Sequence, residues 1–222
     1  MTPPLAAWGV SGEAVMLLGG HRNTVLRVGP YVFKTTRRSE AALRWLGPVQ
    51  DIAARCSLYA PRLIPSQTGA LKVAGWTCEP FCDGVETARD EITEQIGAFH
   101  RLATHIPQRP EFCSSWDLLD RDTSADIDLS VMPADLVSQL CDAWRDVAEV
   151  RTVIHADLNP SNVLTDTQGR ITLIDWDEAR VDAPVFDLGD MSEPARVAWE
   201  IACCWQIEPA HARKLAAGFM AA

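Results

Sequence analysis

The hydrophobic residues of the first 35 positions fall in short runs separated by glycine-containing turns, a pattern typical of antiparallel strands. We predict strands at residues 13–18, 25–28 and 31–35. The first turn contains Gly19 and Gly20, which have no side chain to keep the backbone away from a ligand. Because neighbouring backbone N–H groups bind anions, this turn is a candidate contact for the phosphates of a nucleotide.

Beyond this predicted sheet, apolar residues recur every three or four positions, which is the spacing of amphipathic helices. Ser39 has the side chain of a helix N-cap, and Pro133 is placed to open another helix. The predicted helical segments are 39–46, 49–58, 88–106, 133–147, 194–205 and 209–220, and one further strand is predicted at 71–81. We therefore expect an α+β protein with a small N-terminal antiparallel sheet and one helix, followed by a larger, mostly helical part.

Two stretches interrupt this regular pattern. Residues 79–84 contain proline, aspartate and glycine, and here we place the boundary between an N-terminal lobe, residues 1–81, and a C-terminal lobe, residues 82–222. Residues 107–132 carry two prolines and many aspartates and serines, without helical or strand periodicity. This second stretch either forms a loop that shapes a substrate pocket or is a surface connection, and both interpretations stay open.

The main candidate for a reactive centre lies between Val153 and Asp190. Two short apolar strands, 153–154 and 171–174, are each followed by a group of polar side chains. The turn at 166–170 contains residues that favour turns, and we predict that it folds the second strand back beside the first. The polar side chains that this arrangement would bring together are Asp157, Asn162 and Asp175.

These three side chains suit one kind of chemistry. A carboxylate accepts the proton of a hydroxyl group, while amide and carboxylate oxygens are ligands for a hard divalent cation such as Mg²⁺. Phosphoryl transfer from a nucleotide to a hydroxyl needs both functions. The spacing His155-x-Asp157-x-x-x-x-Asn162, with Asp175 thirteen residues later, therefore predicts a kinase reaction.

Composition narrows the possible partners. The 222-residue chain is 47% hydrophobic and 23% charged, which is ordinary for a globular protein. Its net charge of −10 argues against nucleic acid as a partner, because neutralising phosphates needs a basic surface. The same charge is compatible with a cationic substrate and equally with solubility alone. No apolar run approaches the roughly 20 residues that cross a bilayer, so we expect no membrane partner.

The seven cysteines are an odd number, and their spacing fits neither a disulfide framework nor a zinc site. The first residues lack the basic and apolar regions of a secretory signal. We therefore expect a reduced, cytoplasmic protein, either a monomer or a homodimer.

Taken in order, the motifs HADLNPSN, IDWDEA and VFDLGD resemble those of the aminoglycoside phosphotransferase and choline kinase-like family. Bacterial members of this family carry H-G-D-x-x-x-x-N, then I-D-F/W-x-x-A, then a Pro/Phe-Asp-Leu element. The N-terminal part also matches, with a Gly-Gly turn, a Val-Phe-Lys strand and a helix that contains a glutamate. The resemblance covers nearly the whole chain and implies a two-lobed protein-kinase-like fold in a small bacterial member.

The resemblance also implies roles for single residues. Asp157 would be the catalytic base, and Asn162 and Asp175 would bind Mg²⁺. Lys34 would contact the phosphates of ATP or GTP, with Glu40 on the following helix holding it in place.

His155 and Asp187 would support the catalytic loop through hydrogen bonds rather than react. Asn159 is a further candidate contact to phosphate or acceptor. Asp177 stands where the family frequently has glycine, so this carboxylate could bind a second metal ion, face a cationic substrate or face solvent.

The implied activity is transfer of the γ-phosphoryl group to a hydroxyl of a small molecule, such as an aminoglycoside or other antibiotic, a sugar or an amino alcohol. The chain is shorter than typical relatives, and the shortening falls in the helical part that binds the substrate. One alternative is a catalytically inactive nucleotide-binding regulatory module of the same fold. A protein kinase is a further alternative, but the segment after Asp175 is short and no A-P-E element follows it.

Overall fold

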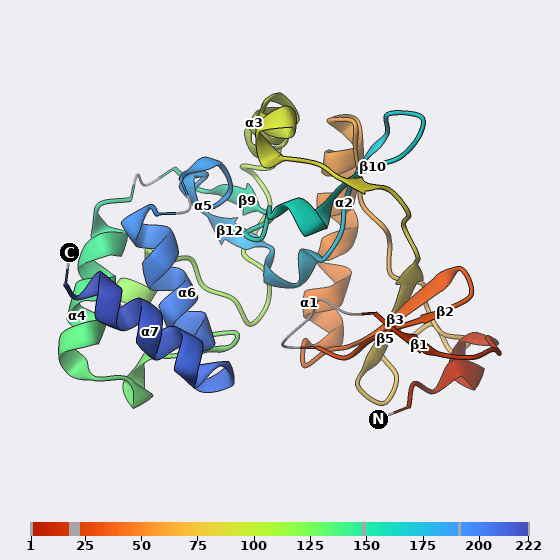
Figure 1. Ribbon diagram of the computed structural model, residues 1–222, viewed down its shortest axis with the longest axis horizontal. Coiled ribbons are helices and arrows are strands. Elements are labelled where there is room, and N and C mark those ends of the chain that lie inside the picture. Colours follow the sequence, from red (N-terminus) through yellow and green to blue (C-terminus); the bar gives the residue numbers. More distant parts are fainter. Residues whose placement is uncertain (1, 18–22, 148–149, 191, 222) are drawn as a thin grey trace. The chain divides into compact units, whose positions relative to one another are not determined.

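The computed structural model describes residues 2–17, 23–147, 150–190 and 192–221. The chain forms two compact units (Figure 1). Unit 1 consists of Met1–Glu91 and Asn159–Trp176, and unit 2 consists of Ile92–Leu158 and Asp177–Ala222. The chain therefore leaves unit 1 after its first 91 residues and returns to it for one short segment.

The N-terminal sheet of unit 1 has the strand order β1-β2-β3-β5, and each neighbouring pair is antiparallel. Its strands are β1 (Val15–Met16), β2 (Val25–Val28), β3 (Tyr31–Thr35) and β5 (Trp76–Pro80). The predicted strands at 25–28 and 31–35 are confirmed, whereas within the described part of the strand predicted at 13–18 only Val15–Met16 form a strand. The strand predicted at 71–81 is shorter because a turn with Gly75 at φ 81° precedes Trp76.

Two helices of unit 1 follow β3, namely α1 (Glu40–Arg44) and α2 (Leu46–Arg55). Ser39 caps α1 as predicted, because its hydroxyl oxygen accepts a hydrogen bond from the backbone N–H of Ala42 at 3.2 Å. Helix α2 begins three residues before the predicted start at Val49, since a proline in the first turn is compatible with helix.

A second sheet of unit 1 corrects the predicted strand pairing. Its order is β4-β11-β10-β6, with strands β4 (Leu58–Tyr59), β11 (Ile171–Leu173), β10 (Val163–Thr165) and β6 (Val85–Glu86). The predicted pairing of 171–174 with 153–154 is wrong, because β11 pairs with β10, a three-residue strand that the sequence analysis missed. The five-residue turn 166–170 directly connects β10 to β11, and so short a connection lets the two strands pair as an antiparallel hairpin.

The pairing of β6 with β10 also keeps residues 82–91 in unit 1. The contacts therefore divide the chain between Glu91 and Ile92, ten residues beyond the predicted boundary after residue 81. They also return residues 159–176 to the first unit, which the predicted division into two continuous lobes does not include. The assignment of residues 1–81 and 82–222 to nucleotide binding and catalysis stays a prediction.

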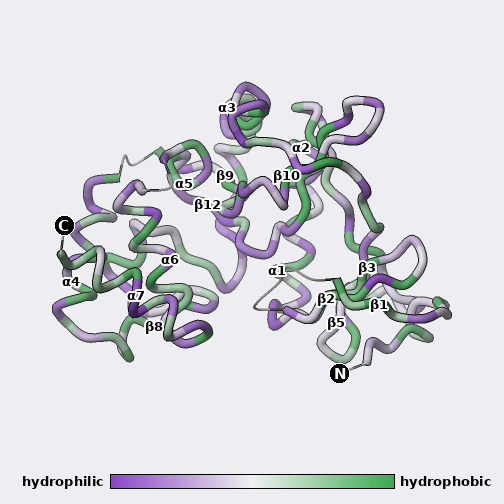
Figure 2. The backbone as a smooth tube through the Cα atoms, viewed as in Figure 1, coloured by the Kyte–Doolittle hydropathy of each residue, from purple (hydrophilic) through white to green (hydrophobic). Residues whose placement is uncertain are grey.

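Unit 2 is mostly helical. Its helices are α3 (Thr93–Leu102), α4 (Ala134–Arg145), α5 (Val185–Leu188), α6 (Pro194–Ile207) and α7 (Pro209–Phe219), and its strands are β7 (Thr123–Ser124), β8 (Ile127–Asp128), β9 (Thr152–Ile154) and β12 (Arg180–Asp182). The helices predicted in the last 30 residues are confirmed, and the helix predicted at 88–106 opens with a 3-10 turn and ends at Leu102. Hydrophobic and hydrophilic residues mix along α4, α6 and α7, as expected for helices with one buried face (Figure 2).

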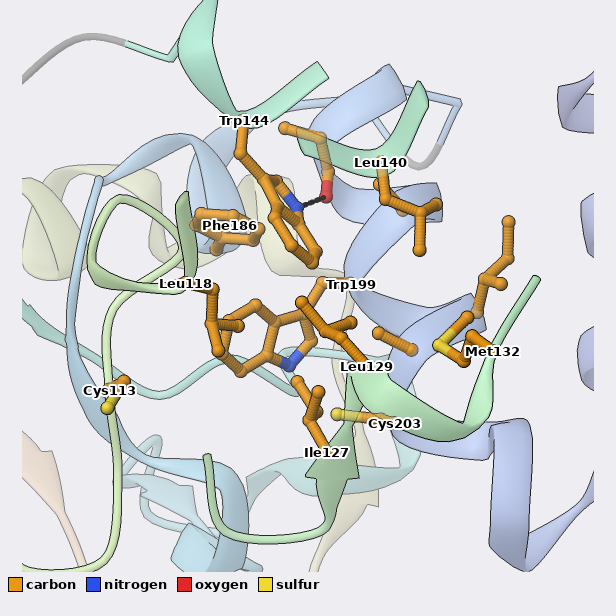
Figure 3. Close-up of a cluster of buried hydrophobic side chains, with 14 of the residues drawn as sticks. Cys113, Leu118, Ile127, Leu129, Met132, Leu140, Trp144, Phe186, Trp199 and Cys203 are labelled. Atoms are coloured by element: carbon orange, nitrogen blue, oxygen red, sulfur yellow. Dashed lines mark hydrogen bonds between the residues drawn. The ribbon is translucent and has the colours of Figure 1, made fainter. Parts of the chain in front are cut away.

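The core of unit 2 is built around two tryptophans, one on α4 and one on α6 (Figure 3). The ring centroids of Trp144 and Trp199 lie 6.1 Å apart, and the indole N–H of Trp144 donates a hydrogen bond to the carbonyl of Ala195 at 3.2 Å. The stretch 107–132 contributes buried side chains to this core, among them Cys113, Leu118, Ile127, Leu129 and Met132. It is therefore a packed part of unit 2 and not merely a surface connection.

Within the described ranges, no helix combines the length and the apolar character that crossing a membrane requires.

Candidate active site

Lys34 lies on β3, where strands flank it on both sides. Its backbone neighbours are Val25 on β2 and Thr77 on β5. The side chain is only 14% exposed, and its ammonium group forms an ion pair with the carboxylate of Asp175. Two predicted site residues that are 141 positions apart in sequence are thus in contact within unit 1.

The β10–β11 hairpin places Asn162 next to the residues that lead to Asp175. The backbone N–H of Ile174 donates to the carbonyl of Asn162 at 3.0 Å, one step beyond the pairing of Val163 with Leu173. Asn162 is buried, while the side chain of Asp175 is 40% exposed. Asp175 also adopts φ 60°, a left-handed conformation that is uncommon outside glycine and typical of functional sites.

These two residues fit the predicted magnesium ion in donor chemistry, because both carry side-chain oxygens and no sulfur or imidazole is needed. Among the described residues there is no group of three or more histidine, cysteine, aspartate or glutamate side chains that could hold a metal. Mg²⁺ is commonly bound by one or two carboxylates together with substrate phosphates and water. A site built on Asp175 and Asn162 is therefore compatible with an ion that arrives with a nucleotide.

Asp157 belongs to unit 2, on the loop that leaves β9, and its side chain is partly exposed. His155, two residues earlier, is fully buried. The ring Nδ1 of His155 accepts the backbone N–H of Asp157 at 3.4 Å. The candidate base Asp157 and the buried His155 are therefore linked through the backbone of one short loop.

Asp187, on the single turn of α5, is fully buried and holds the same loop. Its carboxylate accepts the backbone N–H groups of His155 at 2.9 Å and of Ala156 at 2.7 Å. It also lies 2.9 Å from Nε2 of His100 on α3. These are the contacts that the predicted supporting role requires, although the role itself stays a prediction.

Two opposing effects act on the pKa of Asp187. Burial raises it, but the hydrogen bond and charge of His100, followed by His155, outweigh burial and leave the pKa below its ordinary value. Asp187 is thus a carboxylate at neutral pH. A charged acceptor strengthens its bonds to the backbone N–H groups of the loop.

The loop that carries Asp157 contains a strained residue, Ala156, which Asp187 holds. Ala156 adopts φ 70°, in the left-handed region where an L-residue with a side chain is strained. The H-G-D motif that this sequence resembles has glycine at this position, and glycine would adopt the same conformation without strain. Asp187 fixes the N–H of Ala156 itself, so the buried carboxylate holds the turn at its strained residue.

Glu40 has described partners other than Lys34. Its carboxylate accepts the backbone N–H of Leu71 at 3.0 Å and pairs with Arg44 at 2.7 Å, four residues along α1. Glu40 therefore links α1 to the segment before β5, while Lys34 contacts Asp175. The predicted Lys34–Glu40 contact is not among the interactions that the structure gives for Glu40.

The remaining predicted residues are distributed more widely. Gly19 and Gly20 lie outside the described residues. Asn159 accepts a hydrogen bond from the hydroxyl of Ser161 and begins the segment that belongs to unit 1. Asp177 has a partly exposed side chain in unit 2, and its backbone carbonyl accepts Nη1 of Arg109 at 2.8 Å.

Sequence reasoning missed His100, Gln108 and Arg109. His100 follows Ile96 by four residues and therefore lies on the apolar face of α3, and a polar residue on such a face was the available signal. Gln108 and Arg109 are in an irregular stretch without periodicity, so no pattern in the sequence marks them.

Three comparisons bear on this site. The model of a family described as phosphotransferase enzyme family matches residues 5–203. A search of curated protein sequences found no match.

Among solved structures, the chain is similar to a choline/ethanolamine kinase family protein from Mesorhizobium loti, with a TM-score of 0.55 and 18% identity over 99% of this chain and 89% of that one. It is also similar to the aminoglycoside phosphotransferase APH(3'')-Id from Streptomyces rimosus in complex with ADP and streptomycin, with a TM-score of 0.51 and 15% identity over 96% of this chain and 86% of that one. These likenesses confirm the predicted α+β, protein-kinase-like fold.

Proposed function

The chain belongs to the phosphotransferase enzyme family, and we propose that it is a small-molecule kinase that transfers the γ-phosphoryl group of ATP or GTP to a hydroxyl group. The observation that carries this proposal is the contact between Lys34 and Asp175 beside Asn162. Binding the phosphates of a nucleotide requires a cationic side chain next to oxygen ligands for Mg²⁺, and Lys34, Asn162 and Asp175 provide both.

Each residue has a distinct task in this proposal. Lys34 binds the phosphates. Asn162 and Asp175 would hold Mg²⁺, which would supply positive charge to offset the negative charge of the transferred group. Asp157 orients the acceptor hydroxyl and takes up its proton as the oxygen attacks phosphorus. Asp187 and His155 keep the loop of Asp157 in its strained conformation.

For the acceptor we propose a chemical class and not a specific compound. The solved relatives named above are a choline/ethanolamine kinase family protein and an aminoglycoside phosphotransferase bound to streptomycin. Amino alcohols and aminoglycosides are cationic molecules with hydroxyl groups, and the net charge of −10 is compatible with a cationic acceptor. We therefore propose a hydroxylated, cationic small molecule as the first class to test.

A transfer assay tests the proposed function. The purified protein would be incubated with MgATP or MgGTP and with choline, ethanolamine, streptomycin, other aminoglycosides, sugars and neutral alcohols. Phosphorylated product would be detected by ³¹P nuclear magnetic resonance and mass spectrometry. We expect transfer to at least one cationic hydroxyl compound, and a comparison of ATP with GTP then gives the nucleotide preference.

Two controls separate this proposal from its alternative. Omitting Mg²⁺, and replacing Asp157 with alanine, should each remove product formation. If MgATP or MgGTP binds in calorimetry but no acceptor is phosphorylated, the result favours the inactive nucleotide-binding regulatory module.

A further inference from the structure

Two consecutive side chains in the irregular stretch 107–132 hold the backbone that follows Trp176. The side-chain amide of Gln108 donates to the carbonyl of Val181 at 2.8 Å and accepts the N–H of the same residue at 2.9 Å. Nη1 of Arg109 donates to the carbonyls of Asp177 at 2.8 Å and Ala179 at 3.0 Å. Four backbone groups between Asp177 and Val181 are therefore bound by two neighbouring side chains, all within unit 2.

The burial of Arg109 shows that this is more than a surface contact. The residue is 1% exposed, and its guanidinium lies 4.6 Å from the ring centroid of Phe112. Placing a charged group in a protein interior is costly unless its donors find acceptors, and here Nη1 donates to two backbone carbonyls. A residue needed only to fill this space would be served by an apolar side chain of similar length.

Residues 177–181, which are held in this way, run into strand β12. Strand β12 forms a two-stranded ladder with β9, and the loop of the candidate base Asp157 follows β9. Strand β12 pairs antiparallel with β9, and the last pair at one end is Arg180 with Ile154. Asp157 lies three residues beyond Ile154, and Asp177 lies three residues before Arg180. Because the strands are antiparallel, both aspartates leave the ladder at the same end.

We propose that Arg109, together with Gln108, is a positioning residue for phosphoryl transfer, acting through the backbone of Asp177–Val181 on the ladder end from which the Asp157 loop departs. This inference rests on the proposed function, since it assigns Asp157 the role of base. Arg109 touches backbone carbonyls and the Phe112 ring and has no assigned contact with substrate. Its effect should therefore fall on turnover and not on nucleotide affinity, because Lys34, Asn162 and Asp175 belong to unit 1.

Substitutions at Arg109 separate hydrogen bonding from packing. Arg109→Met keeps an apolar chain but donates nothing, while Arg109→Lys keeps a donor that can reach one carbonyl at a time. We expect kcat to fall at least tenfold in Arg109→Met and less in Arg109→Lys, with the KM for nucleotide within twofold of wild type in both. Arg121→Met is the matched control, because Arg121 lies exposed in the same stretch, and it should leave kcat unchanged.

Hydrogen exchange gives a readout that does not depend on turnover. The N–H of Val181 is bound by Gln108, so Gln108→Leu and Arg109→Met should each speed exchange in residues 177–181 and leave exchange in β2 and β3 unaltered. Unchanged exchange in this segment, or a kcat of Arg109→Met equal to that of wild type, would overturn the positioning role. An equal rise in nucleotide KM and fall in kcat would also overturn it.

The proposed function can fail separately. If wild-type protein phosphorylates no acceptor, that function is excluded and Arg109 has no reaction to position. The exchange experiment would still report whether Gln108 and Arg109 hold residues 177–181.

Discussion

The carboxylate of Asp175 in unit 1 is 40% exposed and pairs with Lys34, whereas the carboxylate of Asp187 in unit 2 is fully buried and accepts two backbone N–H groups. A partly exposed ion pair contributes little to stability, because water screens it and the side chains lose freedom. A buried carboxylate has no water to replace its partners, so its hydrogen bonds are needed for folding. The difference teaches that groups available to a ligand and groups that hold the loop are distinguished by burial and not by residue type.

The largest loss of activity should come from replacing Asp157. Asp157→Ala removes the proposed base, and loss of a general base typically lowers the rate by about 10²–10⁴-fold. Because Lys34 and Asp175 are unaffected, MgATP should bind with near wild-type affinity in calorimetry. Asp135→Ala, at an exposed position of α4, is the control. Retained turnover of Asp157→Ala with its acceptor would remove Asp157 from this role.

The difference in burial predicts that removing Asp187 lowers the free energy of unfolding more than removing Asp175 does. Asp187→Ala leaves His100 and two backbone N–H groups without their acceptor, which should cost about 3–5 kcal/mol of unfolding free energy. Asp175→Ala breaks only the partly exposed pair, and its cost should be about 1 kcal/mol or less. Urea unfolding of both variants measures the difference. Equal costs would show that burial does not divide the two groups as argued.

For nucleotide affinity, replacing Asp175 should have a larger effect than replacing Asp187. Asp175→Ala removes an oxygen ligand for Mg²⁺, so the affinity for MgATP should fall at least about tenfold, which corresponds to roughly 1.4 kcal/mol. Calorimetry with and without Mg²⁺ measures this change. Asp90→Ala provides a control in the same unit, because the Asp90 side chain is 89% exposed. An unchanged affinity would contradict the metal assignment.

Acid should weaken the contribution of Asp187 to stability. The folded pKa of Asp187 lies below its ordinary value, so the stability contributed by the ionised group is complete above the unfolded pKa and is lost as pH falls through the folded one. The stability advantage of wild type over Asp187→Asn should therefore be constant from pH 7 to about pH 5 and shrink below about pH 4. Urea midpoints at several pH values test this. An advantage that grows on acidification would contradict the sign of the shift.

The motif spacing selected Lys34, Asp157, Asn162 and Asp175 as site candidates, because phosphoryl transfer restricts both residue type and spacing. The structure brings Lys34, Asn162 and Asp175 together in unit 1, and the roles of all four residues stay predictions. The spacing did not predict which strands pair. Strand β10 has only three residues, so its hydrophobic pattern is too short to distinguish it from the loop beside it.

The supporting side chains were harder still to predict. Arg109 acts through backbone carbonyls, and carbonyls are present at every residue, so no partner pattern in the sequence reveals the contact. The burial of His100 becomes meaningful only when Asp187, 87 residues away, is known to lie beside it. Long-range contacts to buried polar groups depend on the tertiary fold and not on local spacing.

The smallest effect concerns Ala156, the strained residue of the loop that carries Asp157. Ala156→Gly removes the left-handed strain at φ 70°, worth about 1–2 kcal/mol for an L-residue, but adds about 0.5–1 kcal/mol of backbone entropy to the unfolded chain. The net result should be a stabilisation of about 1 kcal/mol or less, measured by urea unfolding. In Asp187→Asn, where the charged acceptor of this N–H is lost, the same change should stabilise more. Destabilisation in both backgrounds would show that Asp187 does not hold Ala156 against strain.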